Sequence, residues 1–204
     1  TNHTRFIREN HHFTHFADHV RPHIMTSIDR KRPVRLWSAG SSSGEEVHSL
    51  AMTLLGENRG EASHIRQSDL AILATDINHD VLKIGREGLY DASARNEIPP
   101  AFAKLWVRDA GRQIKMADDL RQLIRFRHLN LIGDWPVRAE FDAIFCRNTM
   151  IYFDAATTEK LQCRLIAHLR PGGHLYIGHS ERLMGKAAAM VANVGQTIFK
   201  KAAA

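Results

Sequence analysis

Two adjacent glutamates, Glu45 and Glu46, lie in the sequence AGSSSGEE, directly after an apolar run and at the start of a helical pattern. Gly40 and Gly44 bracket three serines in this loop, but the spacing is neither G-x-G-x-x-G nor that of a P-loop. A helix start attracts phosphate, and two carboxylates placed there would repel a pyrophosphate. They suit a ligand with a sugar, a base and positive charges but no phosphate, and S-adenosylmethionine is such a ligand. On these residues alone, two glutamates that only stabilise the helix start are an equally good interpretation.

An acidic side chain, Asp76, ends the next apolar run, LAILATDI. A carboxylate at the end of a second strand can accept hydrogen bonds from two ribose hydroxyls. The separation from Gly44 exceeds the usual spacing of about 20 residues, which a long first helix and its following loop explain. Asn78 is better placed than Asp76 to cap the next helix, so we assign Asp76 to the ribose.

Polar side chains also follow two later apolar runs. Asn130, in LNLIGD, can contact a base edge, and Arg147, Asn148 and Tyr152 gather in CRNTMIYFD. Methyltransferases that act on nucleic-acid amino groups typically carry D/N-P-P-Y/F at this position. No proline lies between Asn148 and Tyr152, which counts against methylation of a base.

The elements that position these loops follow from the alternation of apolar runs and helical patterns after Val34. This order predicts an α/β fold with a doubly wound, mostly parallel sheet, which binds ligands at the carboxyl ends of its strands. Ser43 and Glu46 have the spacing of a capping box, and Gly56 can end that helix. Strands are expected at 34–40, 70–77, 124–131, 140–148 and 174–180, with an edge strand at 194–201, and Asp154 is expected to cap a helix.

Residues 89–123 interrupt this alternation of apolar runs and helical patterns. Within them, the polar stretch VRDAGRQIKM predicts an inserted hairpin. We therefore divide the chain into an N-terminal helical segment at 1–30 and a domain at 31–204 that carries the predicted S-adenosylmethionine site; the resemblance given below implies that 1–30 completes this site. Within that domain, 104–128 forms an inserted β subdomain.

The composition of the chain limits which kinds of binding partner we expect. The 204 residues carry a net charge of +6, which favours an acidic partner, but no block of five basic residues indicates nucleic acid. No apolar run is long enough for a membrane span, and the first residues lack a signal core, so we expect a cytoplasmic protein. A stripe of histidines recurs every four residues, at His11, His15, His19 and His23. Because Pro22 interrupts it and no acidic or cysteine ligand completes a site, we expect no metal.

Several stretches of the chain, taken in order, resemble the CheR-type chemotaxis receptor glutamate methyltransferases: TNHTRFIRE, LWSAGSSSGEE, ILATDI, LNL, FDAIFCRNTMIYFD and PGGHLYIGHSE. The resemblance implies the class I methyltransferase (Rossmann-like) form of the sheet, with S-adenosylmethionine as cofactor and S-adenosylhomocysteine as product. With Gly40 of the first loop, the expected cofactor-binding residues are Asn2, Thr4, Arg8, Glu45, Asp76, Asn130, Leu131, Arg147 and Asn148. Tyr152 is expected near the transferred methyl group, with Arg21 as a second catalytic candidate.

The implied substrate is the cytoplasmic helical domain of a chemoreceptor, whose glutamates become methyl esters. A glutamate with a pKa of about 4.3 is already ionised at neutral pH, so no general base is needed. The family usually carries Pro-Tyr where this chain has Val47 and His48, which predicts a reshaped substrate mouth. The chain begins within the cofactor motif, without the family's small basic helical domain, so a shortened form is expected. The short hairpin predicts no tethering to a receptor C-terminal peptide. A non-catalytic cofactor-binding or scaffold module is the alternative.

Overall fold

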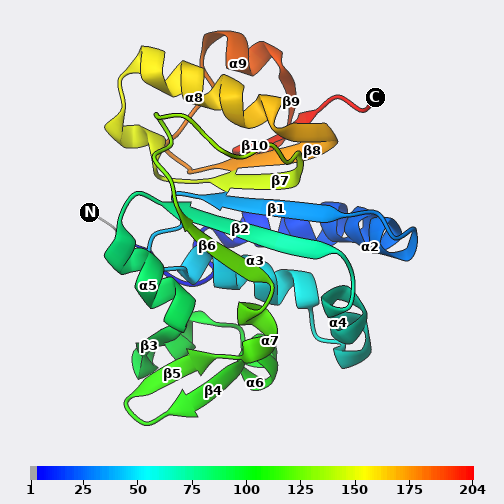
Figure 1. The fold of residues 1–204 in the computed structure, drawn as a ribbon, viewed down its shortest axis with the longest axis vertical. Coiled ribbons are helices and arrows are strands. Elements are labelled where there is room, and N and C mark those ends of the chain that lie inside the picture. The colour runs from blue at the N-terminus through cyan, green and yellow to red at the C-terminus, as the bar shows by residue number, and fades with distance from the viewer. Residues whose placement is uncertain (1–3) are drawn as a thin grey trace.

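A seven-stranded sheet forms the centre of the chain in the computed structural model, which describes residues 4–204 (Figure 1). The strand order is β6-β2-β1-β7-β8-β10-β9, and the first five of these strands are parallel. β10 lies antiparallel between β8 and β9. The bounds are β1 Val34–Ala39, β2 Leu70–Asp76, β6 Ile124–His128, β7 Phe141–Cys146, β8 Leu169–Ile177, β9 Val191–Gly195 and β10 Ile198–Lys201. The predicted doubly wound α/β fold is confirmed, and its strand order reverses between β1 and β7.

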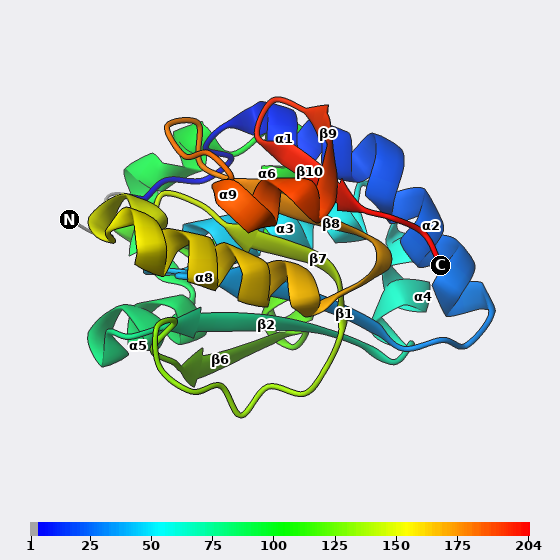
Figure 2. The same ribbon diagram turned by 90° about the horizontal axis from the view of Figure 1, so that it is seen from above.

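Helices cover both faces of this sheet (Figure 2). Strand residues alternate between the two cores: Leu36 packs with the N-terminal helices and α3, whereas Trp37 packs with α8 and α9. The first face is covered by α1 Asn10–His15, the π-helical turn η1 Phe16–Val20, α2 Arg21–Asp29, α3 Glu45–Leu55, α4 Arg59–Arg66 and α5 His79–Glu87. The second is covered by α8 Ala155–Ala167 and α9 Gly185–Ala189. Both faces of the central parallel strands β1 and β7 are therefore largely buried, as their apolar sequences require, whereas the edge strand β6 exposes Arg125 and Arg127.

The inserted subdomain is a three-stranded antiparallel sheet with the order β3-β5-β4. Its elements are β3 Leu89–Asp91, η2 Ala92–Glu97, α6 Pro100–Trp106, β4 Val107–Ala110, β5 Gln113–Met116 and α7 Asp118–Arg121. The hairpin expected in VRDAGRQIKM is confirmed as β4–β5. The bounds differ from the expected 104–128, because the small sheet begins at Leu89 and residues 124–128 pair in parallel with β2.

Helix ends test the capping predictions. Gly56 follows α3, Asn78 Oδ1 accepts hydrogen bonds at the start of α5, and Asp154 Oδ1 accepts one from Thr157 N, as predicted. The predicted Ser43–Glu46 capping box is wrong. Gly44, at a φ of 97°, is the N-cap of α3 without any side-chain bond.

Two further expectations need correction. The single edge strand expected at 194–201 is the end of β9, a turn and β10, because Thr197 has a φ of 56° in the turn that reverses the chain. The edge of the sheet is β9 instead. Pro22 does not interrupt the histidine stripe, because it lies in the first turn of α2, which directly follows η1; the rings of His15 and His19 lie 4.7 Å apart. Among the described residues, no group of three potential ligands is placed to hold a metal ion.

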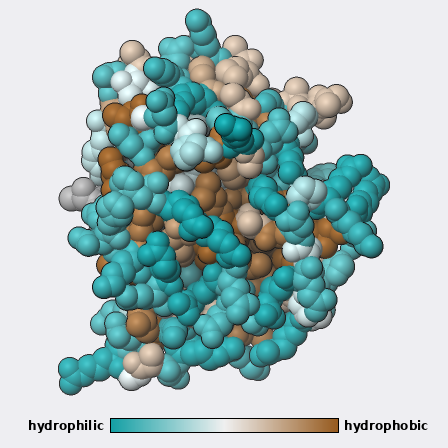
Figure 3. Space-filling view, viewed as in Figure 1, coloured by the Kyte–Doolittle hydropathy of each residue, from teal (hydrophilic) through white to brown (hydrophobic). Residues whose placement is uncertain are grey.

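Hydrophilic side chains cover most of the face shown in Figure 3, and apolar surface gathers toward its middle. Within residues 4–204, no helix combines the length and the apolar character that a membrane span requires.

His48 does not reshape a substrate mouth, because its side chain lies fully inside the core. Its Nε2 donates a hydrogen bond to the Gly85 carbonyl at 3.0 Å, and its ring packs edge-on against Tyr90. Burial lowers the pKa of His48 to about 4. The imidazole is therefore neutral in the folded chain at neutral pH.

Acidification is expected to destabilise the fold through His48. Its pKa is about 4 when folded and near 6.5 when unfolded, so the unfolded chain binds more protons between these values. The stability is complete above pH 6.5 and declines as the pH falls toward 4. At pH 5 the loss from this group is about 2 kcal/mol. Urea unfolding at pH 7 and pH 5 should show a smaller decline for His48→Gln than for the original chain; an equal decline would contradict the assignment.

Candidate functional site

A cavity of about 350 Å³ opens at the carboxyl ends of β1, β2, β6 and β7, where the strand order reverses. This volume falls within the range of small-molecule sites. The N-terminal segment before α1 closes one side of it. The lining residues are Thr4, Arg5, Arg8, Phe13, Gly40, Ser41, Ser42, Glu46, Asp76, Ile77, Leu129, Asn130, Leu131, Ile132, Arg147, Asn148, Thr149, Tyr152 and Phe153.

Most of the residues predicted from the sequence meet at this cavity. Thr4, Arg8, Gly40, Asp76, Asn130, Leu131, Arg147, Asn148 and Tyr152 all line it. Asn2 lies outside the described residues. Glu45 and Arg21 are not among the lining residues. The parallel sheet explains the convergence, because all its loops at this edge follow strands that run in one direction.

Asp76 is held at the end of β2 by the loops around it. Its Oδ2 accepts a hydrogen bond from Ser42 N at 2.9 Å, and its Oδ1 accepts one from Asn78 N at 3.0 Å. Gly40, at a φ of 77°, lets the β1 loop approach the β7 loop so closely that an added Cβ would collide with Thr149. The carboxylate is thereby fixed at the rim of the cavity, with lone pairs left for a ligand.

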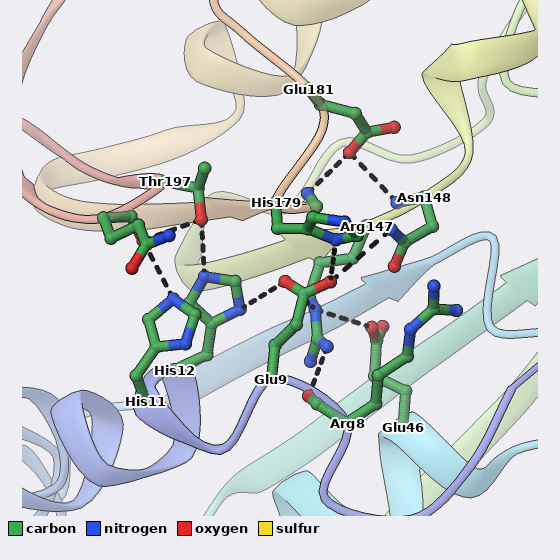
Figure 4. Close-up of polar contacts among 12 residues, drawn as sticks. Arg8, Glu9, His11, His12, Glu46, Arg147, Asn148, His179, Glu181 and Thr197 are labelled. Carbon is green, nitrogen blue, oxygen red and sulfur yellow. Dashed lines mark hydrogen bonds and ion pairs between the residues drawn. The ribbon is translucent and has the colours of Figure 1, made fainter.

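Arg147 is the buried cation of the site, with a side chain only 2% exposed (Figure 4). Its Nη2 donates a hydrogen bond to the Arg8 carbonyl, and its guanidinium lies 5.5 Å from the centre of the Phe13 ring. Nε lies 3.6 Å from a Glu46 oxygen and 3.8 Å from a Glu9 oxygen. Nε and Nη1 have no hydrogen-bond partner within the described part of the chain. A guanidinium that lines a cavity and keeps donors without hydrogen-bond partners is suited to bind a carboxylate.

Within the GEE sequence, Glu46 lines the cavity, whereas the predicted Glu45 is not among its lining residues. Glu46 Oε1 accepts a hydrogen bond from Ser38 Oγ at 2.7 Å, while its other oxygen faces Arg147. Burial raises the pKa of Glu46, and the positive charge of Arg147 opposes that increase. Glu45, the neighbouring residue on α3, turns away and accepts a hydrogen bond from Ser43 Oγ. Adjacent helical residues point about 100° apart, so only one of the two can face the cavity.

Arg21 lies at the opposite end of α3 from the cavity. Its Nε donates a hydrogen bond to the Leu54 carbonyl at 2.7 Å, and its Nη2 pairs with Glu61 at 2.7 Å. Leu54 is about 13 Å along the helix from Glu45, at 1.5 Å per residue. Arg21 therefore stabilises the end of α3, and the structure gives it no catalytic position.

Sequence reasoning missed the carboxylate of Glu9, which links Arg147 to the imidazoles of two histidines. Its oxygens lie 3.6 Å from His12 Nδ1 and 3.2 Å from His179 Nδ1. Burial favours the neutral form of Glu9, but Arg147 and the hydrogen bond from His179 hold its pKa below the ordinary value. Burial and the neighbouring Arg147 lower the pKa of His12 to about 3, and His12 Nε2 bonds to Thr197 Oγ1 in the β9–β10 turn. Glu9 directly follows Arg8 in the sequence, but nothing in its spacing indicated this contact.

Comparison with known proteins decides between the cofactors that such a cavity could hold. Residues 2–199 match the family described as CheR methyltransferase, SAM binding domain. The chain belongs to this family. It is 44% identical over 204 residues to a probable chemotaxis protein methyltransferase of Rhizobium etli, covering 98% of this chain and 75% of that protein. It is 41% identical over 207 residues to chemotaxis protein methyltransferase 2 of Pseudomonas aeruginosa, covering 99% and 70%.

The family makes the chain an S-adenosylmethionine-dependent methyltransferase, as the sequence predicted. The cavity fits this cofactor on its own evidence. The positive charge of Arg147 suits the methionine carboxylate, and the carboxylate of Glu46, which also lines the cavity, suits the ammonium group. Asp76 and the apolar residues Ile77, Leu131 and Ile132 also line the cavity. The cavity therefore offers charged groups for the amino-acid end, a carboxylate for the ribose and apolar surface for the base.

Proposed function

We propose that this chain transfers the methyl group of S-adenosylmethionine to glutamate side chains of a chemoreceptor, giving glutamyl methyl esters. The observation that carries the proposal is that the buried cation Arg147 lines the same cavity as Glu46 and Asp76. The relatives are named chemotaxis protein methyltransferases, and these names support a chemoreceptor as the substrate. The proposed place of action is the cytoplasm, where the helical domain of such a receptor lies.

The residues of the site hold the two reactants in line and exclude water from the acceptor. When bound, S-adenosylmethionine supplies an electrophilic methyl group next to its sulfonium. Arg147 would hold the amino-acid end with Glu46, and Asp76 would accept hydrogen bonds from the ribose hydroxyls. The acceptor glutamate is already ionised, so the chain needs orientation rather than a base, and fixed geometry is the main source of rate.

Tyr152 is the proposed group at the acceptor side. It lines the cavity, yet 61% of its surface is exposed, so an approaching carboxylate can reach it. Its hydroxyl can donate one hydrogen bond that orients the attacking oxygen. Arg5 and Arg8 also line the cavity and supply positive charge for an acidic segment. The proposal does not include tethering to a receptor C-terminal peptide. The hairpin expected to serve that purpose is short, because β4 and β5 have only four residues each.

Tyr152→Phe is expected to lower kcat about 10- to 100-fold, the equivalent of one hydrogen bond to a charged acceptor. The Kd for S-adenosylhomocysteine should stay within about twofold, because the phenol contacts the acceptor rather than the cofactor. Steady-state kinetics and calorimetric titration measure the two quantities on one sample. An equal loss of both would make the hydroxyl a cofactor-binding group.

The function itself is tested with S-adenosylmethionine labelled in its methyl group and the cytoplasmic helical domain of a chemoreceptor. Methyl esters release volatile methanol in alkali, whereas N-methyl groups do not. Label that becomes volatile in alkali, and that disappears when the receptor glutamates are replaced, supports the proposal. Cofactor binding without any transfer would instead support a non-catalytic module.

A further inference from the structure

Glu181 lies in the loop after β8 and is 7% exposed. Its Oε2 accepts hydrogen bonds from Gly178 N at 2.6 Å and from Asn148 N at 3.0 Å. Its Oε1 accepts one from Met150 N at 2.8 Å. Figure 4 shows this carboxylate above Asn148, on the side away from Arg147. A single carboxylate therefore joins the loop after β8 to the loop after β7 through three backbone N–H groups.

The loop that Glu181 holds is strained and tightly packed. Asn148 has a φ of 57°, a left-handed conformation that L-residues other than glycine seldom adopt. Gly178 lies directly against it: a Cβ on Gly178 would come within 2.8 Å of Asn148 N and 2.5 Å of Asn148 Nδ2. Such strained backbone persists only where its surroundings hold it in place. Two of the hydrogen bonds of Glu181, from Asn148 N and Met150 N, hold this loop, and Asn148 Nδ2 donates a longer one to Glu9 Oε1 at 3.5 Å.

We infer that Glu181 is a positioning residue of the cofactor site. It does not line the cavity, but Asn148, whose N–H it binds, does, and so do Arg147 and Thr149 on either side of Asn148. Both carboxylate oxygens are acceptors, so Glu181 satisfies all three N–H groups. A glutamine in its place keeps one acceptor oxygen and turns an NH₂ group toward a backbone N–H, which that NH₂ group cannot accept. The inference rests on the cofactor and is independent of the methyl acceptor.

Glu181→Gln is expected to weaken binding of S-adenosylhomocysteine at least tenfold in calorimetric titration of the full chain. Glu159→Gln is the matched control, because Glu159 Oε1 also accepts a backbone hydrogen bond, from Lys186 N at 2.9 Å, but joins α8 to α9 away from the cavity. The control should bind as the original chain does. Equal affinity of Glu181→Gln and the original chain would overturn the inference, as would an equal loss in Glu159→Gln.

A second variant reaches the same contact from the other loop. Gly178→Ala should push Asn148 and also weaken binding, whereas Gly133→Ala meets no atom closer than 3.6 Å and should not. If both changes act by displacing Asn148, the double variant Glu181→Gln/Gly178→Ala loses less affinity than the product of the two single losses. Two outcomes would overturn the inference and leave Glu181 with a general structural role. In one, the affinity losses of the two single changes multiply fully in the double variant; in the other, the affinity of each variant falls in proportion to its melting temperature. Failure of the original chain to bind S-adenosylhomocysteine would count against the cofactor site itself.

Discussion

Replacing Arg147 with alanine is expected to abolish measurable cofactor binding and to lower the free energy of unfolding by about 3–5 kcal/mol. The guanidinium is the positive charge between Glu9 and Glu46, at 3.8 Å and 3.6 Å. Its removal leaves two buried carboxylates without their counter-charge and opens the space that would hold the methionine end of the cofactor. The pKa of Glu46, already raised by burial, should rise further, because the charge of Arg147 opposes that increase. Denaturant unfolding at pH 7 measures the loss of stability.

Arg147→Lys separates the charge of this residue from its shape. An ammonium keeps the positive charge beside Glu9 and Glu46 but cannot present the planar fork that binds a carboxylate with two parallel hydrogen bonds. This variant should therefore fold with most of the original stability, yet bind S-adenosylmethionine at least about tenfold more weakly, a loss of about 1.4 kcal/mol or more. Unchanged affinity in Arg147→Lys would show that charge alone suffices. An alanine variant as stable as the original chain would remove Arg147 from the structural role.

The parallel strands and the loops after them could be predicted because their signals are local. Apolar runs ending in Asp76 and Asn148 mark strand ends, and parallel strands bring those ends to one edge of the sheet. Which of Glu45 and Glu46 lines the cavity could not be predicted from such a local pattern. It depends on the rotation of α3 about its axis, which Gly44 sets by serving as the N-cap.

The cases of Arg21, Glu9 and Glu181 share a physical cause: each side chain contacts a segment far away in the chain. Arg21 was a candidate through the family resemblance, but it lies at the start of α2 and donates a hydrogen bond to the Leu54 carbonyl, at the far end of α3. Glu9 and Glu181 gained no attention because a lone carboxylate in a sequence carries no sign of its partners. Glu181 reaches Asn148 across 33 residues, and Glu9 meets His179 across 170. Only the packed fold shows which loops such carboxylates join.

Asp76→Ala is expected to weaken S-adenosylmethionine binding by about 1.5–3 kcal/mol, the contribution of hydrogen bonds to a charged acceptor. This corresponds to a Kd roughly 10- to 150-fold higher. Because Asp76 also accepts hydrogen bonds from Ser42 N and Asn78 N, the loss could arise from the loop rather than the ribose. Asn78→Ala is the matched control, since it removes the cap of α5 at a cost of about 1 kcal/mol without altering the cavity.

A cofactor analogue makes this last prediction specific to the ribose. S-Adenosylhomocysteine that lacks the 2′-hydroxyl should bind the original chain more weakly than the complete molecule does. In Asp76→Ala the two ligands should bind almost equally, because the carboxylate that distinguishes them is gone. Full discrimination in Asp76→Ala would mean that another group reads the sugar, and Asp76 would then serve only to hold Ser42 and Asn78 in place. Loss of discrimination in Asp76→Ala, with discrimination retained in Asn78→Ala, would assign the ribose to Asp76.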